Sequence, residues 1–229
     1  MNRKALKTTF LDTVPVLTGY LFLGAGFGIL LGEKTGLGVG WAVAMAVFML
    51  AGSGQYLAVS LIADHASLIT VAISTLLVNA RHIFYGISLL VPYKGAGKKK
   101  PYLIFALTDE TYSLVCGELP GLAPEDRTNY ELLVSLLNHL YWIVGSIAGA
   151  VAGSLIRFNS QGIDFALTAL FLTVFTDQWL TAKKHGPALI GLGASVASLL
   201  IFGKDNFLIP AMLIIALTLC LYKEETAND

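Results

Sequence analysis

Residues 13–32 read TVPVLTGYLFLGAGFGILLG, a run without any charged side chain. A helix that crosses the hydrocarbon core of a bilayer needs about 20 mostly apolar residues, and this run has that length. Arg3, Lys4 and Lys7 precede it, which resembles the start of a signal peptide, but no clear small-residue cleavage site follows. We therefore predict that this run is a membrane helix that stays in the mature protein.

Apolar runs of similar character recur along the chain. They lie at 39–63, 67–91, 102–117, 130–156, 163–181, 187–203 and 206–222. Only 13% of the 229 residues are charged and 55% are apolar, whereas about 25% charged residues are typical of soluble domains. We predict a single transmembrane domain over 1–229. It is an all-α polytopic membrane protein with seven or eight membrane segments, some broken or re-entrant.

The composition also argues against several classes of protein. The 15 basic and 15 acidic residues cancel, so no overall positive field attracts nucleic acid. We find no HExxH, GxSxG, GxGxxG or P-loop motif, and the four histidines are scattered. We therefore expect neither an enzyme nor a bound cofactor, and no metal site.

A polar stretch, Ala51-Gly52-Ser53-Gly54-Gln55, interrupts the segment 39–63. Glycine weakens a helix, and irregular backbone at membrane depth survives only where it is buried in protein or lines a cavity. We predict that backbone groups of Gly52–Gln55 bind a substrate, with Ser53 and Gln55 adding side-chain partners. The alternative is a helix kink stabilised by its neighbours.

The same interruption bears on orientation. The positive-inside rule places the basic N-terminus and the Lys98–Lys100 cluster both in the cytoplasm. An even number of crossings must then separate them, yet three apolar segments lie between. We therefore predict that 39–63 enters and leaves by the same face; three full crossings would put the lysines outside.

Glycines recur every fourth residue at two places 121 residues apart. The two rows are Gly24, Gly28 and Gly32, and Gly145, Gly149 and Gly153. Small residues at this spacing let helix backbones approach closely, so we predict a packing role. Chance is one explanation for the second row. The other is two inverted repeats over 13–117 and 130–222, whose polar breaks, at Gly52–Gln55 and Thr176–Gln178, correspond as in secondary transporters.

Charged and amide side chains inside the apolar segments are candidates for function. Asn79 and Arg81 lie deep in 67–91, where an arginine is costly unless it is paired or hydrated. Arg81 either binds a substrate carboxylate or pairs with an acid. The candidate acids are Asp109, Glu110 and Asp177.

Two adjacent acids, Asp109 and Glu110, lie within the short segment 102–117. Burial favours the neutral form of a carboxyl group, so one of them is a candidate proton carrier unless both lie at a wet interface. Asp177 and Gln178 end the segment 163–181, where an interfacial salt bridge is the alternative. Trp142 is either an interfacial anchor or part of a pocket.

Together these elements resemble a known family over nearly the whole chain. The run Ala51–Gln55, the Asn79-x-Arg81 pair, the Leu107-Thr108-Asp109-Glu110-x-Tyr112 element and Trp142 with its following glycines are similar to the AzlC family. That family comprises the large subunits of bacterial branched-chain amino acid exporters. No single element is specific, but their combination and order are.

The resemblance implies a multi-pass protein of the bacterial inner membrane. It would export valine, leucine, isoleucine and methionine across the lipid bilayer with a small AzlD-type membrane subunit, driven by the proton motive force. An ion or small-solute channel is the alternative. The expected substrate-binding residues are Gly52, Ser53, Gly54, Gln55, Asn79, Arg81, Tyr112, Trp142 and Gln178. The expected proton-coupling residues are Asp109, Glu110 and Asp177.

Overall fold

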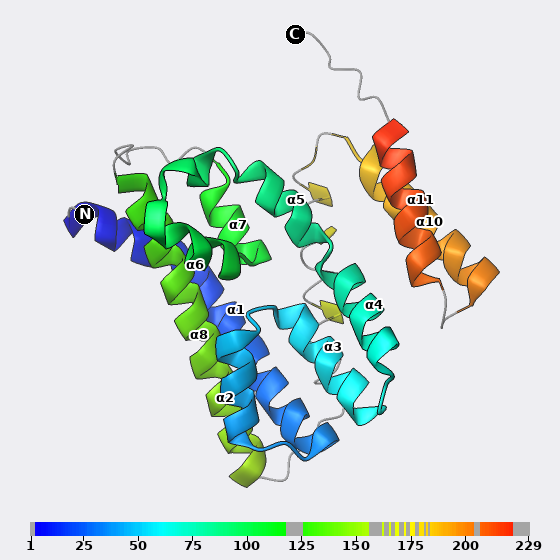
Figure 1. The fold of residues 1–229 in the computed structure, drawn as a ribbon, viewed down its shortest axis with the longest axis horizontal. Coiled ribbons are helices and arrows are strands. Elements are labelled where there is room, and N and C mark those ends of the chain that lie inside the picture. The colour runs from blue at the N-terminus through cyan, green and yellow to red at the C-terminus, as the bar shows by residue number, and fades with distance from the viewer. Residues whose placement is uncertain are drawn as a thin grey trace. The chain divides into compact units, whose positions relative to one another are not determined.

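The computed structural model is helical throughout the residues that it describes, which are 3–117, 126–155, 184–203, 207–221 and isolated positions between 162 and 182 (Figure 1). The chain divides into two compact units, 1–168 and 169–229. In the second unit, α10 (Gly186–Phe202) packs against α11 (Leu208–Leu221), matching the predicted segments 187–203 and 206–222. The single domain over 1–229 stays a prediction.

Two long helices, α1 (Arg3–Thr35) and α8 (Arg127–Leu155), form the centre of the first unit. Both are long and apolar enough to cross a membrane. They pack through the two predicted glycine rows. A Cβ atom built at Gly24 would lie 2.9 Å from the Ser146 nitrogen, and one at Gly145 would lie 2.6 Å from the Tyr20 carbonyl oxygen.

The contact is close along most of the crossing. A Cβ at Gly149 would collide with the backbone of Ala25, and one at Gly153 would lie 3.2 Å from the Ile29 Cα atom. Gly32 does not take part, because the nearest atom to its Cβ position is 3.8 Å away. The predicted packing role is therefore confirmed for both rows except at Gly32.

The order of these contacts shows that α1 and α8 run in the same direction, since successive residues of one meet successive residues of the other. Figure 1 shows both helices starting at the end that holds the N-terminus. Inverted repeats would begin with antiparallel helices. The predicted inversion is therefore wrong for halves that open with these two helices.

The predicted interruption in 39–63 is present. The helix α2 (Val39–Phe48) ends before Met49, and α3 (Gly52–Ala63) begins after Ala51. The Gln55 side chain on α3 donates to the carbonyl oxygens of Met45 in α2 and of Met49 in the break, and Figure 1 shows the two helices leaving the break in opposite directions, as an open hairpin. Its two ends lie at the same end of the unit (Figure 1).

The position of the irregular backbone differs from the prediction. Gly52–Gln55 form the first turn of α3, because the Gln55 N–H donates to the Ala51 carbonyl oxygen at 2.8 Å. The break itself comprises Met49–Ala51. Glycine here serves close approach, as described below, rather than an unwound chain.

The segment 67–91, predicted as one helix, is two: α4 (Leu68–Asn79) and α5 (Arg81–Ser88). They are bent by 45° at the break, and together they are long and apolar enough for one span. Neither glycine nor proline marks the bend at Ala80. The Arg81 side chain, which follows the bend directly, contacts partners on α3 and α7 that are described below.

The segment 102–117 is also divided. After the short 3-10 helices η1 (Pro92–Gly95) and η2 (Gly97–Lys99), α6 (Lys100–Phe105) and α7 (Asp109–Val115) form a second hairpin. Asp109 and Glu110 therefore lie at the start of a helix, not in the middle of one as predicted. The reason is the Thr108 hydroxyl, which accepts from the Thr111 N–H and caps α7.

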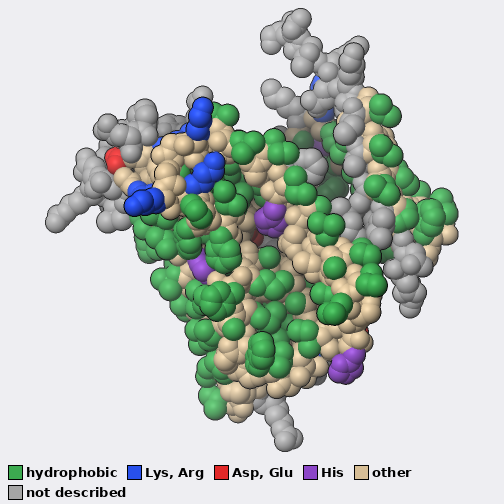
Figure 2. Space-filling view, in the orientation of Figure 1, with side chains coloured by type: hydrophobic (Ala, Val, Ile, Leu, Met, Phe, Trp, Pro, Cys, Tyr) green, Lys and Arg blue, Asp and Glu red, His purple; other side chains and the backbone are tan. Residues whose placement is uncertain are grey.

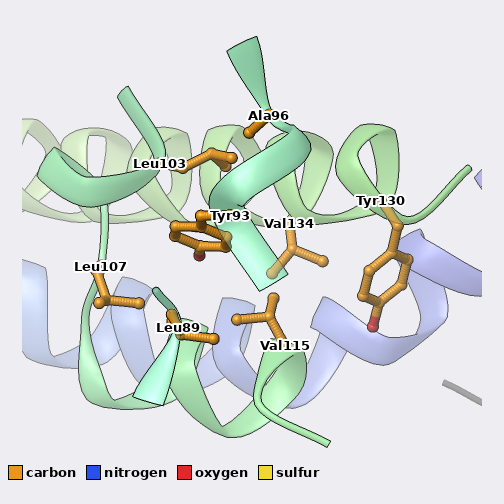
Figure 3. Packing of buried hydrophobic residues seen from close by; sticks show 8 residues of the cluster. All are labelled: Leu89, Tyr93, Ala96, Leu103, Leu107, Val115, Tyr130 and Val134. Carbon is orange, nitrogen blue, oxygen red and sulfur yellow. The ribbon is translucent and has the colours of Figure 1, made fainter. Parts of the chain in front are cut away.

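Apolar packing holds this second hairpin against α5 and α8 (Figure 3). The cluster comprises Leu89, Tyr93, Ala96, Leu103, Leu107, Val115, Tyr130 and Val134. Arg127, the first residue of α8, donates to the Val115 carbonyl oxygen at 3.0 Å and pairs with Glu131 at 2.9 Å. Both ends of the hairpin thus lie near the start of α8.

Charge is unevenly distributed over the first unit. In Figure 2, lysine and arginine side chains gather at the end that holds η1, η2 and α6, and hydrophobic side chains cover much of the remaining face. That end also holds the start of α1 (Figure 1). The basic N-terminus and Lys98–Lys100 therefore lie at one end of the unit, as the orientation argument requires.

Candidate functional site

Three helix breaks meet at one side chain. The Arg81 guanidinium, at the start of α5, donates to the Ser53 hydroxyl at 2.8 Å and pairs with Asp109 Oδ2 at 2.9 Å. Ser53 lies in the first turn of α3, and Asp109 is the first residue of α7. One cation thus connects the tips of both hairpins to the bend between α4 and α5. We call this group the Arg81 centre.

Of the pairings that the sequence allows for Arg81, the structure contains the one with Asp109. The two side chains are 32% and 35% exposed, so the described part of the protein does not enclose the pair. A ligand that offers a carboxylate to Arg81 and an ammonium group to Asp109 can therefore replace the pair without leaving either charge unpaired.

Glycine makes room at the start of α3. A Cβ atom at Gly52 would lie 3.1 Å from the Trp142 ring, and one at Gly54 would lie 3.4 Å from the Asn79 amide nitrogen. A larger residue at Gly52 would press α3 away from Trp142 on α8, whereas one at Gly54 would fill the space beside Asn79 on α4. The two glycines thus bring the first turn of α3 against both neighbours.

This first turn offers hydrogen-bond donors. The first N–H groups of a helix have no partner within it, and the preceding residue, Ala51, has no side-chain acceptor for them. Helix starts attract negative charge. Together with Arg81, the start of α3 is suited to bind a carboxylate.

Asn79 is predicted as a site residue and lies beside this turn. Its amide nitrogen donates to the Thr75 carbonyl oxygen at 2.9 Å. Its Oδ1 atom is buried and has no hydrogen-bond partner among the residues that the structure describes. Buried acceptors are nearly always satisfied, so this atom is available to a donor such as an ammonium group.

The two adjacent acids have different partners. Asp109 faces Arg81, whereas the Glu110 carboxylate accepts from the Tyr20 hydroxyl at 2.7 Å. The same hydroxyl lies 2.7 Å from Thr108 Oγ1. The centre therefore separates a charge-paired acid from an acid in a hydroxyl network, which suits them to different tasks.

Aromatic rings flank the centre. Tyr112 of α7 stacks on Tyr85 of α5, with ring centroids 4.4 Å apart and an interplanar angle of 15°. Trp142 meets Tyr20 edge to face at 5.3 Å and lies nearly parallel to Phe27 at 6.4 Å. These rings give the centre apolar walls.

The polar groups of Gln55 and Trp142 are used within the protein. The Trp142 Nε1–H donates to Gln55 Oε1 at 2.9 Å, and the Gln55 amide nitrogen donates to the carbonyl oxygens of Met45 and Met49. Gln55 is fully buried. This arrangement fixes the α2–α3 hairpin to α8 and leaves neither polar group for a ligand.

The predicted site residues thus fall into three groups. Those at or beside the centre are Gly52, Ser53, Gly54, Asn79, Arg81, Asp109, Glu110 and Tyr112. Gln55 and Trp142 support it. Asp177 and Gln178 lie outside the described residues. Within the described part of the chain, no group of three or more His, Cys, Asp or Glu side chains could hold a metal ion.

Sequence reasoning missed four residues of the network. Four buried side chains form a series of hydrogen bonds, each to the next, in the order Tyr20, Thr108, Thr111 and Asn138. Thr108 before two acids is a typical helix start, so this break was readable. Nothing in the sequence connects Tyr20 of α1 to the acids of α7.

Long apolar helices, two hairpins and a polar centre at the helix breaks define a helical membrane protein. The family model described as AzlC protein matches residues 15–156, so the chain belongs to the AzlC family.

Relatives agree with this assignment. The branched-chain amino acid transport protein AzlC of Bacillus subtilis is 43% identical over 212 residues, covering 92% of this chain and 82% of the relative. An uncharacterized membrane protein of Haemophilus influenzae is 40% identical, and the match covers 97% of this chain and 92% of the relative. The inner membrane protein YgaZ of Escherichia coli is 23% identical, and the match covers 89% of this chain and 82% of the relative. No solved structure matches the chain significantly.

Proposed function

We propose that this chain exports branched-chain amino acids and methionine from bacteria, and that the Arg81 centre is its binding site. The observation that carries the proposal is the pairing of Arg81 with both hairpin tips. The Bacillus subtilis relative, named as a branched-chain amino acid transport protein, supports the substrate class.

In the proposed bound state, the amino acid inserts into the ion pair. Its carboxylate replaces Asp109 beside Arg81 and the start of α3, because a guanidinium and helix N–H groups both bind carboxylates. Its ammonium group binds Asp109 and the free Asn79 oxygen. In this exchange, Arg81 gains the carboxylate of the ligand and Asp109 gains its ammonium group, so both charged side chains keep a partner.

The aliphatic side chain would lie against the aromatic walls formed by Tyr85, Tyr112 and Trp142. One methylene in an apolar pocket changes binding by only about 1–3 kcal/mol. We therefore expect valine, leucine, isoleucine and methionine to compete with one another.

Transport also requires orientation and energy. We propose that the chain lies in the inner membrane with the Lys98–Lys100 end and the N-terminus in the cytoplasm. The α2–α3 hairpin would then re-enter from the opposite face. Glu110 would exchange the coupling proton, and a small AzlD-type membrane subunit would act with this chain.

The test is valine efflux from cells preloaded with a valine-containing dipeptide, with the chain expressed alone and with its small partner. We expect accelerated efflux that a protonophore abolishes. Arg81→Gln should reduce the rate about 10-fold or more, because charged hydrogen bonds contribute about 1.5–3 kcal/mol. Glu33→Gln, which neutralises an exposed charge at the far end of α1, is the matched control.

Efflux that follows an ion gradient without saturating with valine would instead indicate a channel. No acceleration under either expression condition, with the protein present in the membrane, would refute the substrate class.

The acids provide a second test. Asp109→Asn should weaken valine efflux, and Glu110→Gln should leave residual efflux that no longer responds to the protonophore, because the glutamine cannot titrate. Both variants should insert normally into the membrane. If both export like the unmodified chain, with the same protonophore sensitivity, the assigned proton role is wrong.

A further inference from the structure

A continuous row of hydrogen-bonding groups connects Glu110 to the middle of α8. Tyr20 OH lies 2.7 Å from Glu110 Oε2 and 2.7 Å from Thr108 Oγ1. Thr108 Oγ1 lies 3.0 Å from Thr111 Oγ1, and the Asn138 amide nitrogen donates to Thr111 Oγ1 at 3.0 Å. The row passes from α7 to α1, back to α7 and on to α8.

The row is dry. Tyr20 and Thr108 are 4% and 6% exposed, and Thr111 and Asn138 are fully buried. Water therefore cannot supply the hydrogens that these contacts need, and the groups must supply them to one another.

Counting hydrogens shows that the row has two possible orders. As they stand, Tyr20 donates to Glu110 and Thr108 donates to Thr111. Each hydroxyl has a single hydrogen, so the 2.7 Å contact between Tyr20 and Thr108 is left without one. One of the two donations must reverse to satisfy it.

Which donation reverses depends on Glu110. When the carboxylate is ionised, Tyr20 donates to it, Thr108 donates to Tyr20, and Thr111 must donate to Thr108. When Glu110 holds a proton, the carboxyl donates to Tyr20, Tyr20 donates to Thr108, and Thr108 donates to Thr111. Only Glu110 takes a proton from water. Each hydroxyl in the row keeps its own hydrogen and rotates it toward a different acceptor.

Asn138 ends the row and can respond to this change. Its Oδ1 atom is buried without a hydrogen-bond partner among the described residues. In the protonated order, the Thr111 hydrogen is released from Thr108, and a rotated Asn138 amide would accept it through Oδ1. The amide would thus donate in one state and accept in the other.

We propose that Tyr20, Thr108 and Thr111 transmit the protonation state of Glu110 to Asn138, and that Asn138 is a positioning residue for the coupling proton. This rests on the proton exchange proposed above for Glu110. The titratable side chains that face Glu110 are Tyr20 of α1, Asp109 of its own helix and Tyr85 of α5. The row that connects Glu110 to α8 does not include the Arg81 side chain, which the proposed function assigns to substrate binding.

The test reads the proton directly, by infrared spectroscopy on the purified full chain. The C=O band of a protonated carboxyl group is followed against pH and assigned to Glu110 by its loss in Glu110→Gln. Thr111→Val removes the hydroxyl at nearly constant shape, and Asn138→Leu removes the amide. We expect each to lower the midpoint of the band by about one pH unit, because in the protonated order each leaves a buried hydroxyl hydrogen without an acceptor, whereas in the ionised order each leaves only an acceptor unfilled.

Thr111→Ser keeps the hydroxyl and should restore the midpoint. Ser135→Ala removes a buried hydroxyl of α8 that, among the described residues, donates to the Glu131 carbonyl oxygen, and it should not move the midpoint. An unmoved midpoint in Thr111→Val and Asn138→Leu overturns the proposal, as does an equal shift in Thr111→Val and Thr111→Ser.

Valine transport in proteoliposomes forms the second arm. Thr111→Val should reduce uptake driven by a pH gradient about 10-fold while valine exchange without a gradient changes less than about 2-fold. If the midpoint shifts but neither the unmodified chain nor any variant transports valine, the substrate proposal is refuted and the proposed transmission along the hydroxyl row is supported. If the unmodified chain transports valine but the midpoint does not shift in the variants, the proposed transmission is refuted and the substrate proposal is supported.

Discussion

The α1–α8 crossing and the Arg81 centre lie in the same unit but are held together by opposite means. At the crossing, glycines bring backbone against backbone, with the Gly145 Cβ position 2.6 Å from a carbonyl oxygen of α1. At the centre, long polar side chains span the gaps between hairpin tips. Backbone contact leaves little freedom to move, whereas an ion pair can be exchanged for another. The rigid part and the exchangeable part are thus built from different residues.

The largest effect should come from the crossing. In Gly149→Ala, the added methyl would collide with the Ala25 backbone, so the two helices must separate. We expect a loss of about 3 kcal/mol in stability, measured as a lower thermal midpoint of the folded protein in detergent.

The control is Gly32→Ala, where the nearest atom to the added methyl is 3.8 Å away. Its stability should change by about 1 kcal/mol or less. Equal thermal midpoints for the two variants would show that the crossing tolerates separation, which would contradict the comparison.

A smaller effect on stability, but a larger one on transport, should come from the centre. Arg81→Gln leaves Asp109 without its charged partner, at a cost of about 1 kcal/mol because the pair is partly exposed. Adding Asp109→Asn should recover that stability without recovering valine efflux. Recovery of efflux in the double variant would mean that the pair is structural only.

An effect on stability of similar size should come from the support of the centre. Trp142→Phe keeps the ring contacts with Tyr20 and Phe27 but loses the hydrogen bond to Gln55. We expect a loss of about 1 kcal/mol. A double-mutant cycle with Gln55→Leu should give a coupling of similar size, and additive effects would show that the hydrogen bond contributes nothing.

Local features of the sequence predicted local structure well. Glycines within an apolar run predicted a break at Ala51–Gln55, next to the actual break at Met49–Ala51, and the glycine spacing predicted close helix packing. The bend at Ala80 was not readable, since no glycine or proline lies there. The ion pair beside the bend joins Arg81 and Asp109, residues 28 apart in sequence, and such long-range partners leave no local signature.

The same limit applies to the candidate site. Residue types identified Arg81, Asp109 and Glu110, because charges inside apolar segments are costly. They did not reveal that Glu110 bonds to Tyr20 rather than to Arg81. Nor did they show that the polar groups of the Gln55 side chain are already hydrogen-bonded to Met45, Met49 and Trp142.

The Arg81–Asp109 pair also bears on how the membrane voltage acts on this protein. One positive and one negative side chain make the empty centre neutral, and an amino acid zwitterion adds no net charge to it. A carrier whose site is neutral both empty and loaded moves through the electric field at no electrical cost in either direction. In the proposed export mechanism, voltage would then act only on the proton that Glu110 exchanges, and the current measured per exported amino acid would count protons alone.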